Sequence, residues 1–328
     1  MNILAVIPCL NEADHLGPLI DQMLADPAIG LLVVADGGSD DGSRAIVSAR
    51  MADNPRLALL DNADRIQSAG INRAVARYGT GFAWFLRIDA HCIYPDDYAG
   101  ILVASAARHD ATAVVVPMLT HARAGFQCAV AAAQNSILGT GGSPHRHVDR
   151  GRFVDHGHHA LIDLAMFRKL GGYCEAMPCN EDAELDHRQA RAGGRIWLEP
   201  AAAICYFPRR TPQALWRQYL NYGIGRARNL RRHGEMPRLR QLLPVAVPLA
   251  VAAVPLALVH WIFAVPAALW IGACLAGGFV VGARAGGGWA LGAGAAAAIM
   301  HLAWGSGFIR EMAGRRTPVP PRYGLDPA

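Results

Sequence analysis

The chain has 328 residues, a formal net charge of +5 and 52% hydrophobic residues, which is enough for one α/β domain and a second unit. Its charge is uneven, because no Asp, Glu, Lys or Arg occurs from Leu242 to Ala283. About 20 apolar residues cross a bilayer once, so this run argues against a wholly soluble protein and predicts membrane segments. A second apolar run, from Trp289 to Ile309, follows after Arg284.

The first part of the chain alternates short apolar runs with amphipathic segments. We expect buried strands over residues 3–8, 31–35, 57–60 and 82–88, and helices over residues 15–24, 43–52 and 68–78, with Ser43 as the N-cap of the second helix. Three strand–helix repeats imply right-handed crossovers and a parallel sheet. Residues 98–117 add a helix and a strand, residues 120–165 are expected to be less regular, and further elements are expected over residues 166–170, 181–192, 195–198 and 212–232. The predicted fold class is α/β, with a Rossmann-like nucleotide-binding domain.

Four short polar signatures lie where a predicted strand ends or a predicted helix begins. They are Asn11-Glu12, Asp36-Gly37-Gly38-Ser39, Asp89-Ala90-His91 and Asn180-Glu181-Asp182. Open α/β sheets bind ligands at the carboxyl ends of their strands, so we expect the signatures to meet at one edge of the sheet. Clustered carboxylates there would repel an anionic nucleotide unless a divalent cation lies between them. The sequence therefore predicts an acidic, metal-dependent pocket.

The signatures at Asp36 and at Asp89 follow strands, and each allows two interpretations. The Asp36 carboxylate is suited to accept a hydrogen bond from a nucleobase N–H or a ribose hydroxyl, while the glycines after it let a ligand approach the backbone. The alternative is a turn that this carboxylate caps. Asp89 and His91 suit a Mn²⁺ or Mg²⁺ ion that bridges a diphosphate. The alternative is a hydrogen-bonded Asp/His turn.

The last signature, Glu181-Asp182, opens a predicted helix. Its functional interpretation is a general base that takes a proton from an acceptor hydroxyl. The helix dipole alone also favours carboxylates in a first turn, so a structural interpretation stays open.

A second candidate contact region is the motif from Gln218 to Arg226. Its aromatic residues, Tyr219 and Tyr222, are suited to stack on a sugar, and Arg226 is suited to contact a phosphate. Anchoring at a membrane interface is the plain alternative. A dense histidine cluster lies earlier in the chain, at His145, His147, His156, His158 and His159. We interpret it as polar lining of an acceptor site, because it lacks the helical His pair with an adjacent Glu that is typical of zinc sites.

Arginines gather just before the first apolar run. They are Arg226, Arg228, Arg231, Arg232, Arg238 and Arg240. By the positive-inside rule this flank is cytoplasmic, and beside a membrane segment it suits anionic lipid rather than nucleic acid. No signal peptide is expected, because the chain starts directly on a predicted strand. The seven cysteines show no paired metal spacing, which favours reduced thiols in the cytoplasm.

Assembled in order, these residues resemble the membrane-attached, inverting glycosyltransferases of family 2, which have the GT-A fold. Ile7-Pro8-Cys9-Leu10-Asn11-Glu12 is similar to the family's opening strand and loop, Asp36-Gly37-Gly38-Ser39 to its nucleotide-binding turn, and Asp64-Arg65 to its uridine-side contact. Asp89-Ala90-His91 is similar to its DxD metal motif, with His91 in place of the last carboxylate. Asn180-Glu181-Asp182 is similar to its Glu-Asp motif. The resemblance covers essentially the full chain, including residues 139–143, 218–226 and 301–305.

The resemblance implies one-step, inverting transfer of a sugar from a nucleotide-diphosphate sugar, such as a UDP-linked hexose, to a lipid-linked glycan in exopolysaccharide assembly. Asp182, beside Glu181, would be the catalytic base, and Asp89 and His91 would hold Mn²⁺ or Mg²⁺. The residues that would bind the donor are Pro8, Asn11, Glu12, Asp36, Gly38, Asp64, Arg65 and Asp89. Those that would contact the acceptor or the diphosphate are Gln218, Tyr222 and Arg226. Other polysaccharide-assembly proteins are conceivable partners.

The same resemblance implies a domain order. We expect a GT-A domain over residues 1–240 with a basic juxtamembrane helix near residues 212–240, two or three transmembrane helices over residues 241–310, and a Pro/Arg-rich tail over residues 311–328. The protein would lie in the inner (cytoplasmic) membrane with its catalytic domain in the cytoplasm. Two rivals stay open. One is a polyprenyl-phosphate sugar transferase, whose anionic acceptor needs little help from Asp182, and the other is a non-catalytic membrane protein that binds nucleotide sugars.

Overall fold

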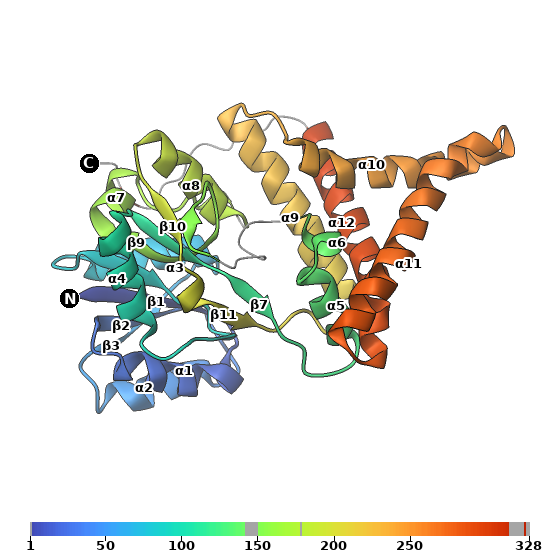
Figure 1. Cartoon of the computed structure of the whole chain (residues 1–328). Helices are drawn as coiled ribbons and strands as arrows, with labels where there is room; N and C mark the ends of the chain where they lie inside the picture. The colour runs from blue at the N-terminus through green and yellow to red at the C-terminus, as the bar shows by residue number, and fades with distance from the viewer. Residues whose placement is uncertain (1, 142–149, 178, 315–324, 326–328) are drawn as a thin grey trace. The chain divides into compact units, whose positions relative to one another are not determined.

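The computed structural model describes residues 2–141, 150–177, 179–314 and 325. The chain forms two compact units, which can be followed in Figure 1. The first contains residues 1–118, 148–205 and 319–328, and the second contains residues 119–147 and 206–318. The functional domain boundaries expected at residues 240 and 310 stay predictions.

The first unit alternates strands and helices, as the apolar runs predicted. Its strands are β1 (Ile3–Cys9), β2 (Ile29–Asp36), β3 (Leu57–Asp61), β4 (Trp84–Arg87), β5 (Cys92–Ile93), β6 (Ala113–Val116), β8 (Arg152–Phe153), β9 (His158–Asp163), β10 (Ile196–Leu198) and most of β11 (Ile204–Tyr206). Its helices are α1 (Ala13–Ala25), α2 (Ser43–Met51), α3 (Gln67–Tyr78), α4 (Tyr98–His109), α7 (Leu164–Lys169) and α8 (Glu181–Arg191). The chain passes into the second unit within β7 (Met118–Thr120), returns to the first unit before β8, and leaves it again within β11.

The main sheet is mixed, so the expectation of a parallel sheet is corrected. Its order is β3-β2-β1-β4-β9-β6-β10-β8. Strands β1, β2, β3 and β4 are parallel, but β9 is antiparallel to both β4 and β6. Strand β9 comes from residues 120–165, which were expected to be less regular. Its apolar part is short and follows a histidine-rich stretch, so local patterning did not reveal that it lies in the middle of the sheet.

The start of α2 differs from its prediction by one residue. Ser43 is the first helical residue, and the N-cap is Gly42, with a left-handed φ of 96° that glycine adopts without strain. The Ser43 hydroxyl donates a hydrogen bond to Asp41 Oδ1 at 2.6 Å. The hydroxyl therefore orders the turn before the helix instead of capping it.

A core on one face of the sheet holds the strands in place. It joins side chains from the strands, such as Phe85 and Ile162, to Ile71 on α3, Phe167 on α7 and Leu185 on α8, and all five are fully buried. The rings of Phe85 and Phe167 lie 5.2 Å apart. Burying each such side chain contributes roughly 1.5–3 kcal/mol. Figure 1 shows α1 and α2 on the opposite side of the sheet from α7 and α8, so the strands are covered on both faces, as continuous apolar runs require.

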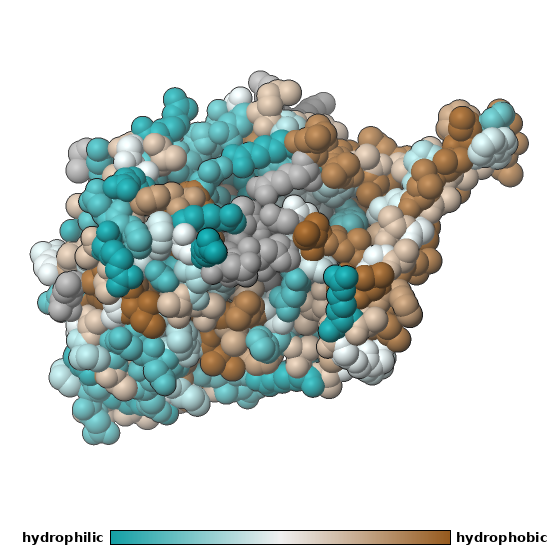
Figure 2. Space-filling view, in the orientation of Figure 1, coloured by the Kyte–Doolittle hydropathy of each residue, from teal (hydrophilic) through white to brown (hydrophobic). Residues whose placement is uncertain are grey.

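The second unit is almost entirely helical. It contains α5 (Phe126–Gln134), α6 (Ile137–Thr140), α9 (Pro212–His233), α10 (Leu239–Ala253), α11 (Val265–Ala285) and α12 (Ala293–Ala313). Within the described residues, three helical segments are long and apolar enough to cross a membrane: Gln241–Leu258, Trp261–Ala285 and Gly288–Ala313. Figure 2 shows hydrophobic surface gathered over α10 and α11, where Leu249, Leu275 and Phe279 are exposed. This surface suits contact with lipid, so the second unit indicates association with a membrane.

The basic helix α9 packs against α12 through glycines. A Cβ atom at Gly223 would lie 2.0 Å from the carbonyl oxygen of Trp304, and one at Gly307 would lie 2.1 Å from that of Leu220. Neither position can hold a side chain unless the helices move apart, and such small-residue contacts are typical of helix pairs in membranes. Arg228 on α9 also pairs with Glu311 on α12 at 3.2 Å.

Candidate functional site

The loop after β1 and the loop after β2 are joined by hydrogen bonds. Asn11, with a left-handed φ of 58°, accepts a hydrogen bond from the backbone N–H of Asp40 at 3.0 Å. The Ser43 hydroxyl accepts one from the Glu12 N–H at 3.0 Å, and Pro8 pairs with Ala35 across the two strands. The two predicted donor-binding loops therefore form one structure at the carboxyl ends of β1 and β2.

Asp36 braces the turn that follows β2. Its buried carboxylate accepts hydrogen bonds from the N–H groups of Gly38 and Ser39, and from Arg44 Nη1 at 2.8 Å. Burial alone would raise the pKa of Asp36, but the hydrogen bonds from Ser39 and Arg44 outweigh it and lower that pKa. The contacts of the Asp36 carboxylate in this structure are therefore those that the turn-capping interpretation predicts. A contact with nucleotide stays a prediction.

The third predicted donor segment follows β3. Asp64 pairs with Arg73 on α3, and both side chains are largely exposed. Arg65 has a left-handed φ of 57°, and a Cβ atom at Gly38 would lie 3.4 Å from its Nη2 atom. Arg65 and Gly38 are therefore neighbours, as a shared donor site requires, and their role in binding stays a prediction.

Arg87, the last residue of β4, joins the strand end to α8. Its Nε atom lies 3.3 Å from Asp89 Oδ1, and its Nη1 atom lies 3.1 Å from Glu181 Oε1. The Arg87 side chain is only 6% exposed. Two of the four predicted signatures, one after β4 and one at the start of α8, are therefore held around a single buried guanidinium.

On its other side, Asp89 faces a histidine of β9. His158 Nε2 lies 3.4 Å from Asp89 Oδ2. Burial would raise the pKa of Asp89, but Arg87 and His158 lower it to about 2. Burial also lowers the pKa of His158, to about 4, and the Asp89 charge offsets only part of that shift. At neutral pH this is an ionised carboxylate beside a neutral imidazole.

The protonation states of Asp89 and His158 suit binding to a divalent cation, although the side chains near them are not arranged around a common point as metal ligands are. A carboxylate and a neutral imidazole are the donors that Mn²⁺ accepts. His91, the other predicted ligand, instead places Nδ1 3.1 Å from Glu12 Oε1, and its side chain is 43% exposed. No three His, Cys, Asp or Glu side chains within the described ranges converge closely enough to surround one ion. The carboxylate and imidazole donors therefore fit a divalent cation in their chemistry. His158 is an additional candidate ligand that the resemblance to the DxD motif did not include.

Asp182, the predicted base, lies in the first turn of α8 and keeps accessible surface. It accepts a hydrogen bond from the N–H of Ala183 at 2.7 Å. Burial would raise the pKa of Asp182, but the nearby charges of His156, His159 and Arg87 hold it well below its usual range. Burial raises the pKa of Glu181, and Arg87 offsets this only in part. Of the two carboxylates, Asp182 is the accessible one, and its pKa is the one that is held low.

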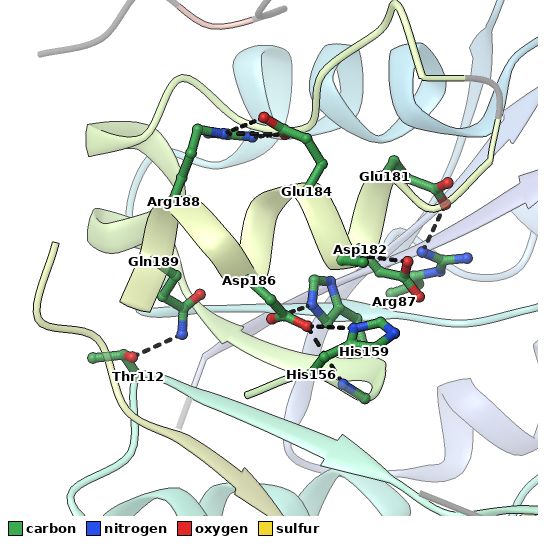
Figure 3. A network of polar contacts seen from close by, with 12 residues as sticks. Arg87, Thr112, His156, His159, Glu181, Asp182, Glu184, Asp186, Arg188 and Gln189 are labelled. Carbon is green, nitrogen blue, oxygen red and sulfur yellow. Dashed lines mark hydrogen bonds and ion pairs between the residues drawn. The ribbon is translucent and has the colours of Figure 1, made fainter. Parts of the chain in front are cut away.

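One turn further along α8, Asp186 holds two histidines beside that carboxylate. Figure 3 shows its carboxylate between His156 and His159, at 2.9 Å from His156 Nδ1 and 2.7 Å from His159 Nε2. His159 Nδ1 also lies 2.7 Å from the hydroxyl of Tyr173. Because Asp186 and His159 are fully buried, this network fixes the imidazoles whose charge lowers the pKa of Asp182.

The remaining predicted contacts lie on α9 in the second unit. Gln218 Nε2 donates hydrogen bonds to the hydroxyls of Tyr206 and Tyr222, each at 3.0 Å. Tyr222 is exposed, and its ring lies 5.5 Å from that of Tyr219. Arg226 lies one helical turn after Tyr222. The motif is therefore an ordered polar cluster, and its contact with acceptor or diphosphate stays a prediction.

The structure brings Asp89, Glu181 and Asp182 together as an acidic cluster around the buried Arg87. His158 and Asp186 lie beside this cluster, where His158 contacts Asp89 and Asp186 contacts His159. His156, His158 and His159 were predicted to line an acceptor site. His145 and His147 of the same cluster, and residues 142–143 of the Gly-rich motif, lie outside the described residues. The sequence contained one signal for Arg87, which is its position at the end of a buried strand, two residues before Asp89.

Comparison with known proteins gives one family. Residues 4–171 match the model described as Glycosyl transferase family 2. The chain is 48% identical over 314 residues to the succinoglycan biosynthesis protein ExoA of Rhizobium meliloti (strain 1021), which covers 94% of each chain. It also shares its fold with the mannosyltransferase PcManGT from Pyrobaculum calidifontis, solved with GDP-Man and Mn²⁺, at a TM-score of 0.60 and 18% identity over 92% of this chain and 86% of that one.

Proposed function

Because the chain belongs to glycosyl transferase family 2, we propose that it is an inverting enzyme that moves a sugar from a nucleoside diphosphate carrier to a lipid-linked glycan. That it is a glycosyltransferase of GT-A fold follows from the family itself. The observation that carries the finer proposal is that Asp89 and Asp182 both lie near the buried Arg87, whose pKa the charge of each raises. In this proposal Asp89 serves the leaving diphosphate, and Asp182 serves the attacking hydroxyl.

The likeness to ExoA supports a role in building an exopolysaccharide such as succinoglycan. A UDP-linked hexose is the donor class that we propose. The three membrane-length helices support an acceptor that is itself held in the membrane by a lipid. With the basic helix α9 on the cytoplasmic side, the enzyme would lie in the inner membrane and face the cytoplasm.

The reaction needs one base and no enzyme nucleophile. Asp182 accepts the proton of the acceptor hydroxyl as that oxygen forms a bond to the anomeric carbon. The bond from the anomeric carbon to the diphosphate oxygen breaks on the opposite face, so the configuration inverts and the nucleoside diphosphate leaves with the electron pair. Because the pKa of Asp182 is held low, the carboxylate is ionised at neutral pH and ready for each cycle.

Glu181 and Asp186 are positioning residues in this proposal. Glu181 holds Arg87 at 3.1 Å, and Arg87 in turn holds Asp89. Asp186 fixes His156 and His159. These contacts keep the two reacting sides at a set separation, which matters because misplacement by about 1 Å costs on the order of 100-fold in rate.

The leaving-group side is formed by Asp89 and His158, with His91 nearby. These residues would hold the divalent cation that we propose, Mn²⁺ or Mg²⁺. When bound there, the cation neutralises charge that develops on the diphosphate. Asp36, Asn11 and the loops that they order would bind the nucleoside.

The test is transfer from radiolabelled donors. Membranes that contain the full chain are incubated with a panel of nucleotide sugars, and lipid-extractable label is counted against membranes that contain the Asp182→Asn variant. The proposal predicts label from one UDP-hexose that depends on Asp182. Label that accumulates equally with the variant, or no transfer from any donor to endogenous lipid-linked glycan, would contradict it.

The polyprenyl-phosphate transferase is distinguished in the same assay. A phosphate acceptor is already anionic, so its attack needs little help from a base. If added polyprenyl phosphate is glycosylated directly and Asp182→Asn has little effect, that rival is correct. A non-catalytic binding protein is disfavoured because both the accessible Asp182 and its supporting network are present.

A further inference from the structure

A cavity of about 690 Å³ lies within the second unit. Its walls come from α5, α6 and the C-terminal end of α11, which can be followed in Figure 1. All of its lining residues belong to this helical unit, and none belongs to the acidic cluster around Arg87. Its volume is in the usual range for small-ligand sites, about 300–1,000 Å³.

One wall of the cavity is apolar. Ala131 and Ala132 line it from α5, Leu138 from α6 and Val281 from α11. Small side chains on α5 leave the space open. A wall of this kind suits a hydrocarbon chain, which needs no hydrogen-bond partner.

Other residues that line the cavity are charged or polar. Arg284 lies one helical turn after Val281 on the same helix face, is exposed, and is the single arginine among the described lining residues. Thr120 and His121 line the cavity as well. The Asn135 side chain exchanges two hydrogen bonds with the backbone of Thr120, at 3.1 and 2.8 Å, so this polar edge is fixed in place.

The position of Arg284 along α11 indicates where the cavity would lie in the bilayer. The candidate span covers Trp261–Ala285, so Arg284 is its next-to-last residue. If α11 crosses the bilayer, Arg284 lies at the interface, where the phosphates of lipids are found. Val281 and the exposed Phe279 then lie just inside the hydrocarbon region. The cavity therefore changes from cationic to apolar at the depth where a lipid does the same.

A buried polar contact holds the α6 wall in place. His301, on α12, donates a hydrogen bond from Nε2 to the carbonyl oxygen of Leu138 at 2.7 Å. Trp270 Nε1 lies 3.3 Å from the other nitrogen of His301. A polar side chain inside a membrane span costs free energy of insertion, and such side chains usually pair with other polar groups. Here the pairing of His301 holds Leu138, a lining residue of the cavity, in place.

We propose that this cavity binds the phosphate-bearing end of a polyprenyl phosphate or diphosphate, with the phosphate on Arg284 and the first isoprenoid units along Ala132 and Val281. In such a lipid the hydrocarbon chain is joined directly to the phosphates, with no glycerol between them. A cation and an apolar side chain that lie one helical turn apart, as Arg284 and Val281 do, suit these two adjacent groups. The inference rests on the proposed function in one respect, since it takes the lipid-linked acceptor as the natural source of this group. Guanidinium groups bind phosphate through paired, charge-assisted hydrogen bonds.

The experiment measures binding without transfer. The full chain is placed in nanodiscs of neutral phosphatidylcholine, and the affinity for a polyprenyl diphosphate is measured by native mass spectrometry. Arg284→Gln should weaken binding by about tenfold or more, as expected for the loss of a charged hydrogen bond. The matched control is Arg310→Gln, an exposed arginine in the last turn of α12, which should bind as the parent does. Neutral polyprenol and inorganic pyrophosphate should each bind at least about tenfold more weakly than the diphosphate lipid.

A second readout uses the parent chain, so it does not depend on whether the Arg284→Gln variant folds. Cys128 lines the cavity and is partly exposed, so the polyprenyl diphosphate should slow its alkylation, measured on the Cys128 peptide by mass spectrometry. Cys205, also partly exposed but in the first unit, serves as the internal control and should react at an unchanged rate. Filling the cavity with Ala132→Trp should abolish the protection of Cys128.

Several results would overturn the inference. These are equal affinity of Arg284→Gln and the parent, equal affinity for polyprenol, or unprotected Cys128. Competition by phosphatidylglycerol as effective as that by the diphosphate lipid would assign the cavity to bulk anionic lipid instead. If the probe binds as expected but no lipid-linked glycan is ever glycosylated, the proposed function fails and the cavity assignment stands.

Discussion

Arg87 and Glu181 are 94 residues apart in the sequence, yet the guanidinium of one lies 3.1 Å from the carboxylate of the other. Both side chains are buried. This contact ties the end of β4 to the start of α8, and Arg87 also lies 3.3 Å from Asp89.

We expect Arg87→Met to destabilise the fold. The change leaves two carboxylates, Glu181 and Asp89, without their buried cation, and breaking a buried pair typically costs about 3–5 kcal/mol. Chemical unfolding of the full chain in detergent measures this. Arg50→Met, which removes a more exposed pair with Asp21, is the control and should cost about 1 kcal/mol or less. Equal losses for the two variants would mean that the buried pair has no special part in stability.

We expect Asp182→Asn to abolish transfer and to retain donor binding. Loss of a general base costs roughly 10²–10⁴-fold, whereas the nucleoside contacts lie elsewhere. Turnover with the native donor and the affinity for UDP are measured on the same preparation. Substantial turnover by the variant on a hydroxyl acceptor would remove Asp182 from the role of base.

We expect His158→Ala to raise the cation concentration needed for half-maximal activity by more than about tenfold, as for Asp89→Ala. Loss of even a supporting residue around a metal typically costs about 10–100-fold in affinity. His91→Ala tests the ligand that the DxD comparison gives, because His91 here contacts Glu12 instead. Titration of Mn²⁺ and Mg²⁺ ranks the three variants. An unchanged metal requirement in His158→Ala would exclude it from the set.

We expect Asp36→Asn to weaken the fold at neutral pH by about 1–3 kcal/mol, the usual cost of a lost charged hydrogen bond. The pKa of Asp36 is lowered in the folded state, so its contribution is fully present above the unfolded value of 3.8 and is lost as the pH falls through the folded value. The stability difference between parent and variant should therefore shrink below about pH 4. A difference that is constant from pH 7 to pH 3 would contradict this, and a UDP affinity that is unchanged at pH 7 would restrict Asp36 to bracing the turn.

We expect Gly307→Ala to lower the unfolding temperature of the full chain. The added methyl would lie 2.1 Å from the Leu220 carbonyl oxygen, and overpacking of this kind costs about 1–3 kcal/mol. The control is Gly272→Ala on α11, where nothing lies within 4 Å, and where alanine should be neutral or should stabilise the helix by about 0.5–1 kcal/mol. If both variants behaved alike, close packing of α9 on α12 would not matter to stability.

Much of the fold could be predicted from local patterns. Apolar runs of four to seven residues gave β1, β2, β3 and β4 because strands buried on both faces need them. The uncharged stretch after Leu242 predicted the membrane-length helices because length and hydropathy alone decide that property. Strand β9 could not be predicted in this way, since its place between β4 and β6 depends on pairing with segments far along the chain.

The candidate site divides in the same manner. The sequence by itself determined which carboxylates are available and that they end strands or begin helices, because those positions follow from local periodicity and from the family's motifs. Only the tertiary structure decided that Arg87 lies between Asp89 and Glu181, that Asp186 holds His156 and His159, and that His158 faces Asp89. Which side chains contact one another depends on which elements the core brings together. The pattern of residue types along the sequence does not give the distances between those elements in space.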